Sequence, residues 1–219
     1  MPPSGLHEDR ILSLADDASR DAVVDRAARI IVSGGLIVYP TETVYGIGAD
    51  ARNAQAVSRI PLVKGRDERK PILVLVGSSD AVTEWASGVS GKARALMNAF
   101  WPGPLTLVFS ARADVSELLT AGTGTVGLRC SPDPFCRELL LRSGAAITST
   151  SANRTGEPTG ATVAEIAGQL GEGIDLYVNA GPRGGRLPST VVDVSGPAPR
   201  LVREGAIARG DLLPFMHAR

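Results

Sequence analysis

Short apolar runs alternate with helical patterns along most of this 219-residue chain, and no other feature constrains its fold as strongly. Residues 36–40 and 105–109 have the length and content of buried strands. Residues 21–32 carry apolar side chains at helical spacing, with Ser19 as the expected N-cap and Gly34 as the stop. This alternation predicts an α/β (α+β) protein. Because strand-like runs crowd near the end of the chain, we expect a twisted sheet of mixed parallel and antiparallel strands with flanking helices.

The same patterns predict the other elements of the chain. Pro61 should kink or end the helix that contains it, because proline cannot donate a backbone hydrogen bond, so the basic stretch after it is expected to be a loop. No internal linker is long enough to mark a boundary, which favours a single domain. Helices are predicted over 53–63, 79–86, 92–100, 134–142 and 162–170, and strands over 71–76, 125–129, 145–148, 175–179, 190–194 and 200–202.

Histidine and cysteine are too few and too poorly placed for several kinds of catalysis. His7 and His217 lie near the chain ends, where order is poorest, which argues against Ser-His-Asp or Cys-His catalysis. Cys130 and Cys136 fit neither a disulfide framework nor a zinc site, so we expect them in the core. The chemistry must then rely on Lys, Arg, hydroxyl and backbone N–H groups.

Charge and hydropathy argue against two classes of partner. Lys+Arg and Asp+Glu number 23 each, so no overall field attracts nucleic acid or membranes. The start, MPPSGLHEDR, lacks the apolar core of a secretion signal, and no later apolar run is long enough to span a bilayer. We therefore expect a cytoplasmic protein with no membrane partner.

Two phosphate-binding patterns fail on their context. The GxGxxG match at 122–127 leads into a predicted strand, whereas a dinucleotide motif must follow a strand and open a helix. SGKAR at 90–94 resembles the end of a P-loop but lacks both the first glycine and the final hydroxyl. Neither pattern predicts a nucleotide site.

Three polar segments lie at predicted strand ends, where α/β proteins form their crevices. They are YPTETVYGIGAD (39–50), KGRDERKP (64–71) and TSTSAN (148–153). Each alone has an ordinary interpretation: turn threonines, a solvated basic loop and a polar turn. Together they suit a polyanion such as ATP, which needs several cations and neutral donors. Lys64 supplies a point charge and Arg66 a flat fork, so the pair can address two phosphate groups differently.

Six motifs in order resemble the Sua5/YrdC family, the threonylcarbamoyl-AMP synthases of tRNA modification. They are YPTETVYGIGADA, KGR, FWPGPLTLVF, TVGLRCSPDP, TSANRTGEPTG and PSTVVDV, and the resemblance runs from 21–32 through LVREGAI at 201–207. It implies a single YrdC-like domain over 1–219, with a core at about 17–210, and a sheet hollowed into a concave cationic crevice. The chain resembles the short form, without the C-terminal Sua5 domain.

The resemblance also implies an activity. Family members are nucleotidyltransferases that condense L-threonine, bicarbonate and ATP into L-threonylcarbamoyladenylate and pyrophosphate. ATP would be a substrate, with Mg²⁺ carried by it. Downstream threonylcarbamoyl transferase proteins would pass the group on to give N6-threonylcarbamoyladenosine at position 37 of tRNA.

Residue roles carry over by motif. The catalytic pairs would be Lys64 with Arg66 and Ser151 with Asn153. No metal ligand is expected in the protein, and Asp50 and Asp193 are interpreted as structural. The residues corresponding to ATP contacts are Lys64, Arg66, Lys70, Thr125, Ser151, Asn153, Thr159 and Arg203, and those corresponding to threonine contacts are Thr41 or Thr43, Arg129, Ser149 and Ser189.

One departure and three alternatives stay open at this point. Leu75 stands where many relatives have a histidine that contributes to the threonine pocket, so the pocket must close otherwise. The alternatives are a module that binds double-stranded RNA or tRNA or serves ribosome maturation, an enzyme of carbamoyl transfer, and a paralogue that has lost the chemistry. The equal charge counts disfavour RNA binding, and the intact K-x-R and S-x-N pairs disfavour lost chemistry.

Overall fold

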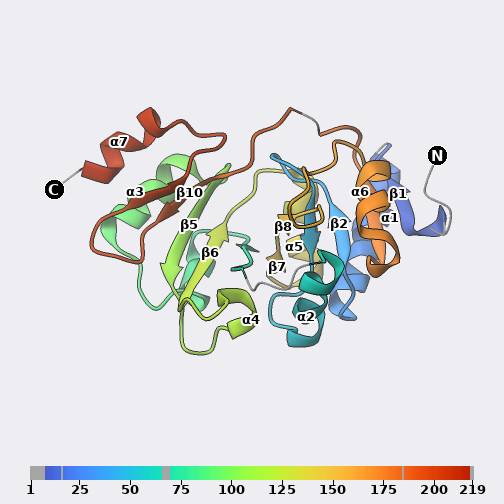
Figure 1. Ribbon diagram of the computed structural model, residues 1–219, viewed down its shortest axis with the longest axis horizontal. Helices are drawn as coiled ribbons and strands as arrows, with labels where there is room; N and C mark the ends of the chain where they lie inside the picture. The colour runs from blue at the N-terminus through green and yellow to red at the C-terminus, as the bar shows by residue number, and fades with distance from the viewer. Residues whose placement is uncertain (1–7, 16, 66–69, 184, 218–219) are drawn as a thin grey trace.

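The computed structural model describes residues 8–15, 17–65, 70–183 and 185–217, which form two mixed sheets side by side (Figure 1). The first sheet has the strand order β1-β9-β2-β3-β8, and the second has the order β11-β10-β5-β6-β4-β7. Both contain parallel and antiparallel pairs. The strands are β1 Ile11–Ser13, β2 Ile37–Tyr39, β3 Gly46–Gly48, β4 Val74–Leu75, β5 Leu105–Ser110, β6 Thr125–Arg129, β7 Ile147–Thr148, β8 Thr150–Ser151, β9 Leu176–Asn179, β10 Thr190–Asp193 and β11 Arg200–Arg203.

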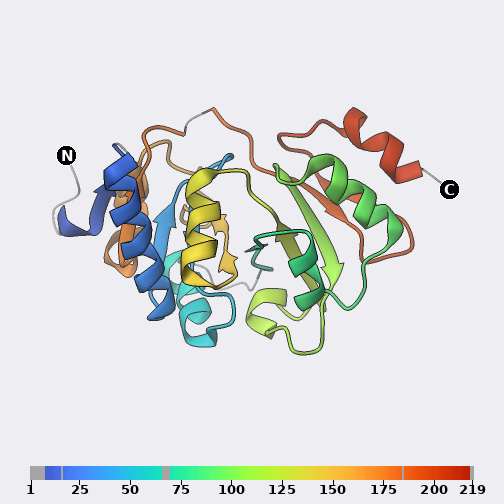
Figure 2. The same cartoon turned by 180° about the vertical axis from the view of Figure 1, so that it is seen from behind.

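Helices cover the outer faces of both sheets. In the rear view, α1 (Asp17–Val32) and α5 (Pro134–Ser143) lie over the first sheet and α3 (Gly91–Phe100) over the second (Figure 2). Apolar residues of α1 and α5 pack with those of β2 and β9 in one buried cluster. The other helices are α2 (Ala54–Val63), α4 (Glu117–Thr120), α6 (Val163–Leu170) and α7 (Arg209–His217), and the short 3-10 turns are η1 (Glu8–Arg10), η2 (Asp80–Glu84) and η3 (Gly171–Gly173).

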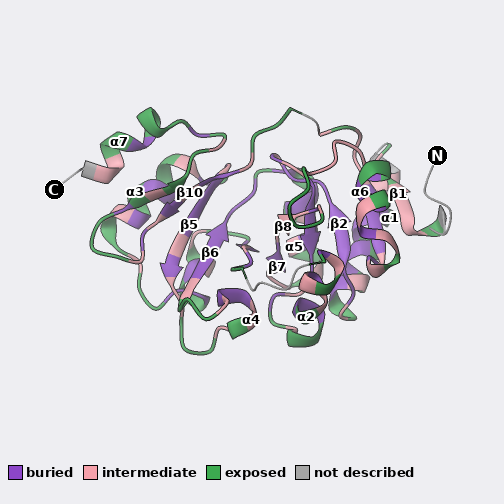
Figure 3. Cartoon of the chain, viewed as in Figure 1, coloured by how far each residue is buried: buried purple, intermediate pink, exposed green. Residues whose placement is uncertain are grey.

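Burial follows the sheets. Strands β2, β5 and β6 are mostly buried, while the outward faces of the helices are exposed (Figure 3). Cys130 and Cys136 are both buried and unpaired, as predicted. Burial raises the pKa of both thiols, which makes them poor nucleophiles.

A run of five residues, 147–151, joins the two sheets. Within it β7 pairs with β4 of the second sheet, and β8 pairs with β3 of the first. The Thr148 hydroxyl accepts a hydrogen bond from Ala49 N at 2.9 Å, and Ser149 N donates to Leu73 O at 2.8 Å. The chain therefore passes from one sheet to the other without leaving extended pairing.

Close packing beside this run explains the glycines of β3. Tyr39 is fully buried and donates a hydrogen bond from its hydroxyl to Thr148 O at 3.0 Å. A Cβ at Gly48 would lie 2.8 Å from Tyr39 Cε1, and one at Gly46 would lie 3.1 Å from Ser149 Oγ. Only glycine lets the ring and the 147–151 run approach β3 this closely.

Most predicted elements are confirmed, with four corrections. Helix α1 begins at Asp17, so Ser19 lies inside it and is not its N-cap. The predicted strand over 71–76 shortens to β4, where only two residues pair in the sheet. The predicted helix over 79–86 is the 3-10 turn η2, whose N-cap residue Ser79 makes no side-chain capping hydrogen bond. The expected single sheet is divided in two. The sequence reading missed β1, β3, β8, α4 and α7.

Candidate active site

A cavity of about 430 Å³ lies between the two sheets, a size typical of small-molecule sites. The 43–46 segment before and in β3 forms one wall, and 149–151 continues it. Strands β5, β6, β10 and β11 form the opposite wall. The lining residues are Thr43, Val44, Tyr45, Gly46, Pro71, Ile72, Leu73, Thr106, Val108, Thr125, Gly127, Arg129, Ser149, Thr150, Ser151, Pro188, Ser189, Val191, Asp193, Arg200, Val202 and Arg203.

Arginines dominate the charge of this lining. Arg129, Arg200 and Arg203 line the cavity together with one acid, Asp193. Asp193 is already engaged, because it accepts hydrogen bonds from Ser195 Oγ at 2.6 Å and from Arg200 Nη2 at 2.9 Å. Partial burial and the charge of Arg129 lower the pKa of Arg203, so these two guanidinium groups are near enough to repel each other. A bound anion would relieve that repulsion.

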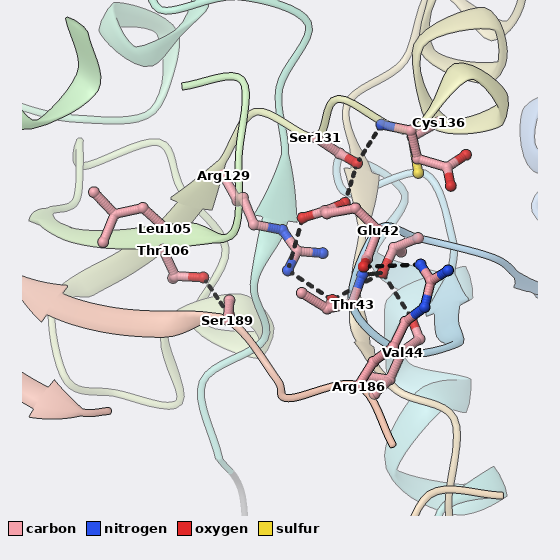
Figure 4. A network of polar contacts seen from close by, with 12 residues as sticks. Glu42, Thr43, Val44, Leu105, Thr106, Arg129, Ser131, Cys136, Arg186 and Ser189 are labelled. Atoms are coloured by element: carbon pink, nitrogen blue, oxygen red, sulfur yellow. Dashed lines mark hydrogen bonds and ion pairs between the residues drawn. The ribbon is translucent and has the colours of Figure 1, made fainter. Parts of the chain in front are cut away.

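Hydroxyl groups complete the polar part of the lining. The hydroxyl oxygens of Thr106 in β5 and Ser189 just before β10 lie 2.9 Å apart (Figure 4). Arg203 Nη2 donates a hydrogen bond to the carbonyl oxygen of Ser189 at 2.9 Å. Thr43 accepts a hydrogen bond from Arg129 Nη1 at 3.2 Å. The cavity thus combines fixed cations with neutral donors and acceptors, a set suited to a small molecule that carries phosphate or carboxylate groups.

Lys64 ties the end of α2 to the loop that follows β8. Its buried ammonium group donates to Asn153 O at 2.8 Å, to Asn153 Oδ1 at 3.2 Å and to the carbonyl oxygen of Ser151. Ser151 Oγ donates to Asn153 Oδ1 at 2.5 Å. Asn53 caps the start of α2, which runs through Pro61 to Val63 and delivers Lys64 to the edge of the cavity.

The structure brings most of the predicted site residues together. Seven of them line the cavity: Thr43, Thr125, Arg129, Ser149, Ser151, Ser189 and Arg203. Lys64 and Asn153 contact one of these seven, Ser151. Arg66 lies outside the described residues, and Lys70 and Thr159 are not among the lining residues.

The two threonines of the 39–50 segment have different places. Thr43 lines the cavity. Thr41 is buried in the turn, where its hydroxyl donates to Val44 O at 2.7 Å and accepts from Thr43 N at 3.1 Å. Thr41 therefore has the ordinary turn role, and Thr43 is the candidate for ligand contact.

Leu75 packs away from the cavity. It is 1 % exposed and lies in the apolar cluster that includes Tyr39 and Ile147. It is not among the lining residues, whereas Ile72 and Leu73 of the same segment are. Leucine at this position therefore leaves no gap in the cavity wall.

The sequence patterns did not predict several residues that line the cavity or contact its lining. Thr106 is the single polar residue within the apolar run LTLVF, and this interruption was an available signal. Glu42 does not line the cavity but forms an ion pair with Arg129 at 3.5 Å, and only the fold brings them together. The apolar part of the wall, including Pro71, Ile72 and Val202, had no sequence signal beyond strand content.

The described residues contain neither a candidate metal centre nor a membrane-spanning helix. Among the described residues, no group of three or more His, Cys, Asp or Glu side chains could hold a metal ion. Within the same part of the chain, no helix has both the length and the apolar character needed to cross a bilayer.

Fold and cavity together define an α/β protein with a polar cavity, lined by three arginines, between two mixed sheets. The sequence profile of the Sua5/YciO/YrdC family, described as "Telomere recombination", matches residues 29–205. The chain belongs to this family.

Individual relatives agree with this assignment. A Mycobacterium tuberculosis protein is 38% identical over 89% of both chains. The threonylcarbamoyl-AMP synthase of Bacillus subtilis is 34% identical, and the match covers 88% of this chain and 56% of the relative. The crystal structure of Pyrococcus abyssi Sua5 complexed with L-threonine superposes with a TM-score of 0.87 at 30% identity, over 94% of this chain and 61% of that one.

Proposed function

We infer that this chain is a threonylcarbamoyl-AMP synthase that condenses L-threonine, bicarbonate and ATP into threonylcarbamoyl-AMP and pyrophosphate. One observation carries the inference: in a chain of this family, the cavity gathers Arg129, Arg203, Ser149, Ser151 and Ser189 from segments far apart in the sequence. Relatives from Bacillus subtilis and Pyrococcus abyssi bear the synthase name. A related structure was solved with L-threonine.

The reaction suits a site without histidine. The amine of threonine and bicarbonate combine as a carbamate with loss of water. A carbamate oxygen then bonds to the α-phosphorus of ATP, and the bond between that phosphorus and pyrophosphate breaks. Two anions must approach while charge builds on the leaving group, so fixed cations and donors lower the barrier.

We propose roles for the residues on this basis. Arg129 pairs with the carboxylate of threonine through its planar fork, and Thr43, Ser149 and Ser189 bind its hydroxyl or carboxylate oxygens. Lys64 and Arg66, with Ser151 and Asn153, hold the triphosphate and orient the α-phosphate. Further contacts to the nucleotide come from Lys70, Thr125, Thr159 and Arg203. The burial of Lys64 among loop oxygens supports a place for it beside Ser151 and Asn153.

Magnesium and the downstream partners belong to the proposal as well. Mg²⁺ enters with the phosphates of ATP, since Asp193 is already bound to Ser195 and Arg200. The product passes to threonylcarbamoyl transferase proteins that modify tRNA, in the cytoplasm. Direct binding of double-stranded RNA is not favoured, because the named relatives are synthases.

The test is an incubation of the protein with ATP and bicarbonate plus threonine, serine or no amino acid. Mass spectrometry should find threonylcarbamoyl-AMP, and pyrophosphate release should depend on both threonine and bicarbonate. Absence of the adenylate, combined with RNA affinity that falls steeply with salt, would replace the proposal with the RNA-binding alternative. Formation of carbamoyl-AMP without threonine would replace it with carbamoyl transfer.

A further inference from the structure

Glu42 lies partly buried beside Arg129 and outside the lining of the cavity. Its side chain is 14% exposed and that of Arg129 is 4% exposed, and Glu42 Oε1 lies 3.5 Å from Arg129 Nη1. Figure 4 shows Glu42 and Ser131 on one side of the guanidinium, with the pair Thr106 and Ser189 on the other. The acid is therefore behind the arginine as seen from the cavity.

Glu42 is itself held in place at both its side chain and its backbone. The hydroxyl of Ser131 donates a hydrogen bond to Glu42 Oε2, and Ser131 Oγ in turn accepts from Asp133 N at 3.2 Å. The backbone oxygen of Glu42 accepts from Arg186 Nη1 at 3.1 Å. Its position is thus fixed by the segment just before α5 and by the segment that leads into β10.

Arg129 depends on this acid for its charge balance. A guanidinium taken out of water is costly unless an opposite charge is near. Among the described residues, Arg129 Nε has no hydrogen-bond partner, and Nη1 contacts Thr43 Oγ1 and the Glu42 carboxylate. Arg203 on the same wall repels it. Without the carboxylate, the guanidinium would have one neutral contact and one repulsive neighbour.

We propose that Glu42 is a positioning residue that aims the Arg129 guanidinium into the cavity, so that Arg129 can receive the carboxylate of the amino-acid substrate. This proposal rests on the proposed function and assigns the substrate carboxylate to the face of Arg129 opposite Glu42. Glu42 does not line the cavity, and its Oε1 is inaccessible, so it acts through Arg129 and not on the substrate.

The kinetic consequence is selective. A displaced Arg129 weakens binding of threonine, whereas the triphosphate contacts proposed for Lys64, Ser151 and Asn153 lie on the other sheet's loop and keep their geometry. The Michaelis constant for threonine should therefore rise, while the Michaelis constant for ATP should stay unchanged. A role of Glu42 in folding alone would leave both constants unchanged in whatever fraction of the protein is folded.

The test compares Glu42→Gln, which keeps the shape but removes the charge, with Glu84→Gln, which removes the charge of an exposed ion pair with Arg52. We expect Glu42→Gln to raise the threonine KM about 10- to 100-fold, the range set by misplacing a binding group, with the ATP KM within about twofold. The Glu84→Gln control should match the wild type in both constants.

Other outcomes decide against the proposal. A threonine KM within about twofold of the wild type, or equal rises in both constants, would overturn it. If Glu42→Gln does not fold, Ser131→Ala removes only the hydrogen bond that orients the acid and must give a smaller rise in threonine KM; an unchanged KM in this variant would refute the proposal. A wild type that forms no adenylate would overturn the proposed function and this inference together.

Discussion

Replacing Lys64 with methionine removes the ammonium group that joins α2 to the 151–153 loop while keeping much of the side-chain volume. The group donates to Asn153 O, to Asn153 Oδ1 and to the carbonyl oxygen of Ser151, and the lysine is 3% exposed. Hydrogen bonds to charged groups contribute about 1.5–3 kcal/mol each. Two effects make the loss of folding stability smaller than the combined value of these three hydrogen bonds.

First, the loop residues Ser151 and Asn153 are only half-buried, so their oxygens can bind water in the variant. Second, the methionine variant no longer carries the desolvation cost of a buried charge. We therefore expect a loss of about 2 kcal/mol, close to the value of a single charged hydrogen bond. For a chain of this size, that loss lowers the melting temperature by about 4–8 °C.

Thermal unfolding followed by circular dichroism measures the loss of stability, and pyrophosphate release measures the loss of turnover. Lys64→Met should lose about 100-fold or more in turnover, the usual cost of removing a group that stabilises transition-state charge. The matched control is Lys92→Met at the start of α3, where melting temperature and turnover should both stay near wild type. A Lys64→Met protein with wild-type melting temperature and turnover would refute the reasoning on both counts.

Three further predictions concern packing, catalysis and pH. Gly48→Ala should destabilise the fold by about 1–3 kcal/mol in chemical denaturation, because its Cβ would lie 2.8 Å from Tyr39 Cε1; an unchanged midpoint would contradict this. Asn153→Ala should reduce pyrophosphate release about 100-fold in a folded protein, and normal turnover would remove its assigned role. Burial raises the pKa of Asp133 in the folded protein above its ordinary value of 3.8. The stability that the protonated Asp133 carboxyl contributes is therefore fully present below pH 3.8 and is lost as the pH rises through the folded-state pKa. Asp133→Asn should therefore gain stability relative to the wild type as the pH rises from about 4 to 7, and parallel stability curves would contradict the sign.

The elements that could be predicted are those whose pattern is local. Strand β6 was predicted at its observed bounds because TVGLR is an apolar run with breakers before it. Strand β3 was missed because its sequence is GIG, and glycine signals a turn until the neighbouring Tyr39 ring is known. Strand β8 was missed for a similar reason, since its two residues lie in a polar stretch and are ordered by pairing with β3.

Only some residues of the candidate site could be predicted from the sequence. Family motifs supplied Arg129, Ser149 and Ser189, and the cavity brings them together. The sequence could not separate the roles of Thr41 and Thr43, because two residues of one turn differ only in which way the backbone directs them. Nor could it indicate Glu42, whose partner Arg129 is far along the chain and meets it only through the arrangement of the two sheets.

The short run at 147–151, which belongs to both sheets, bears on how the molecule loses its structure. Strands β7 and β8 are consecutive, so unpairing one pulls on the other and removes a partner from each sheet. The two halves are thereby made interdependent, and we expect the chain to melt in one cooperative transition. Neither half would then persist as an autonomous fragment if the polypeptide were cut between them.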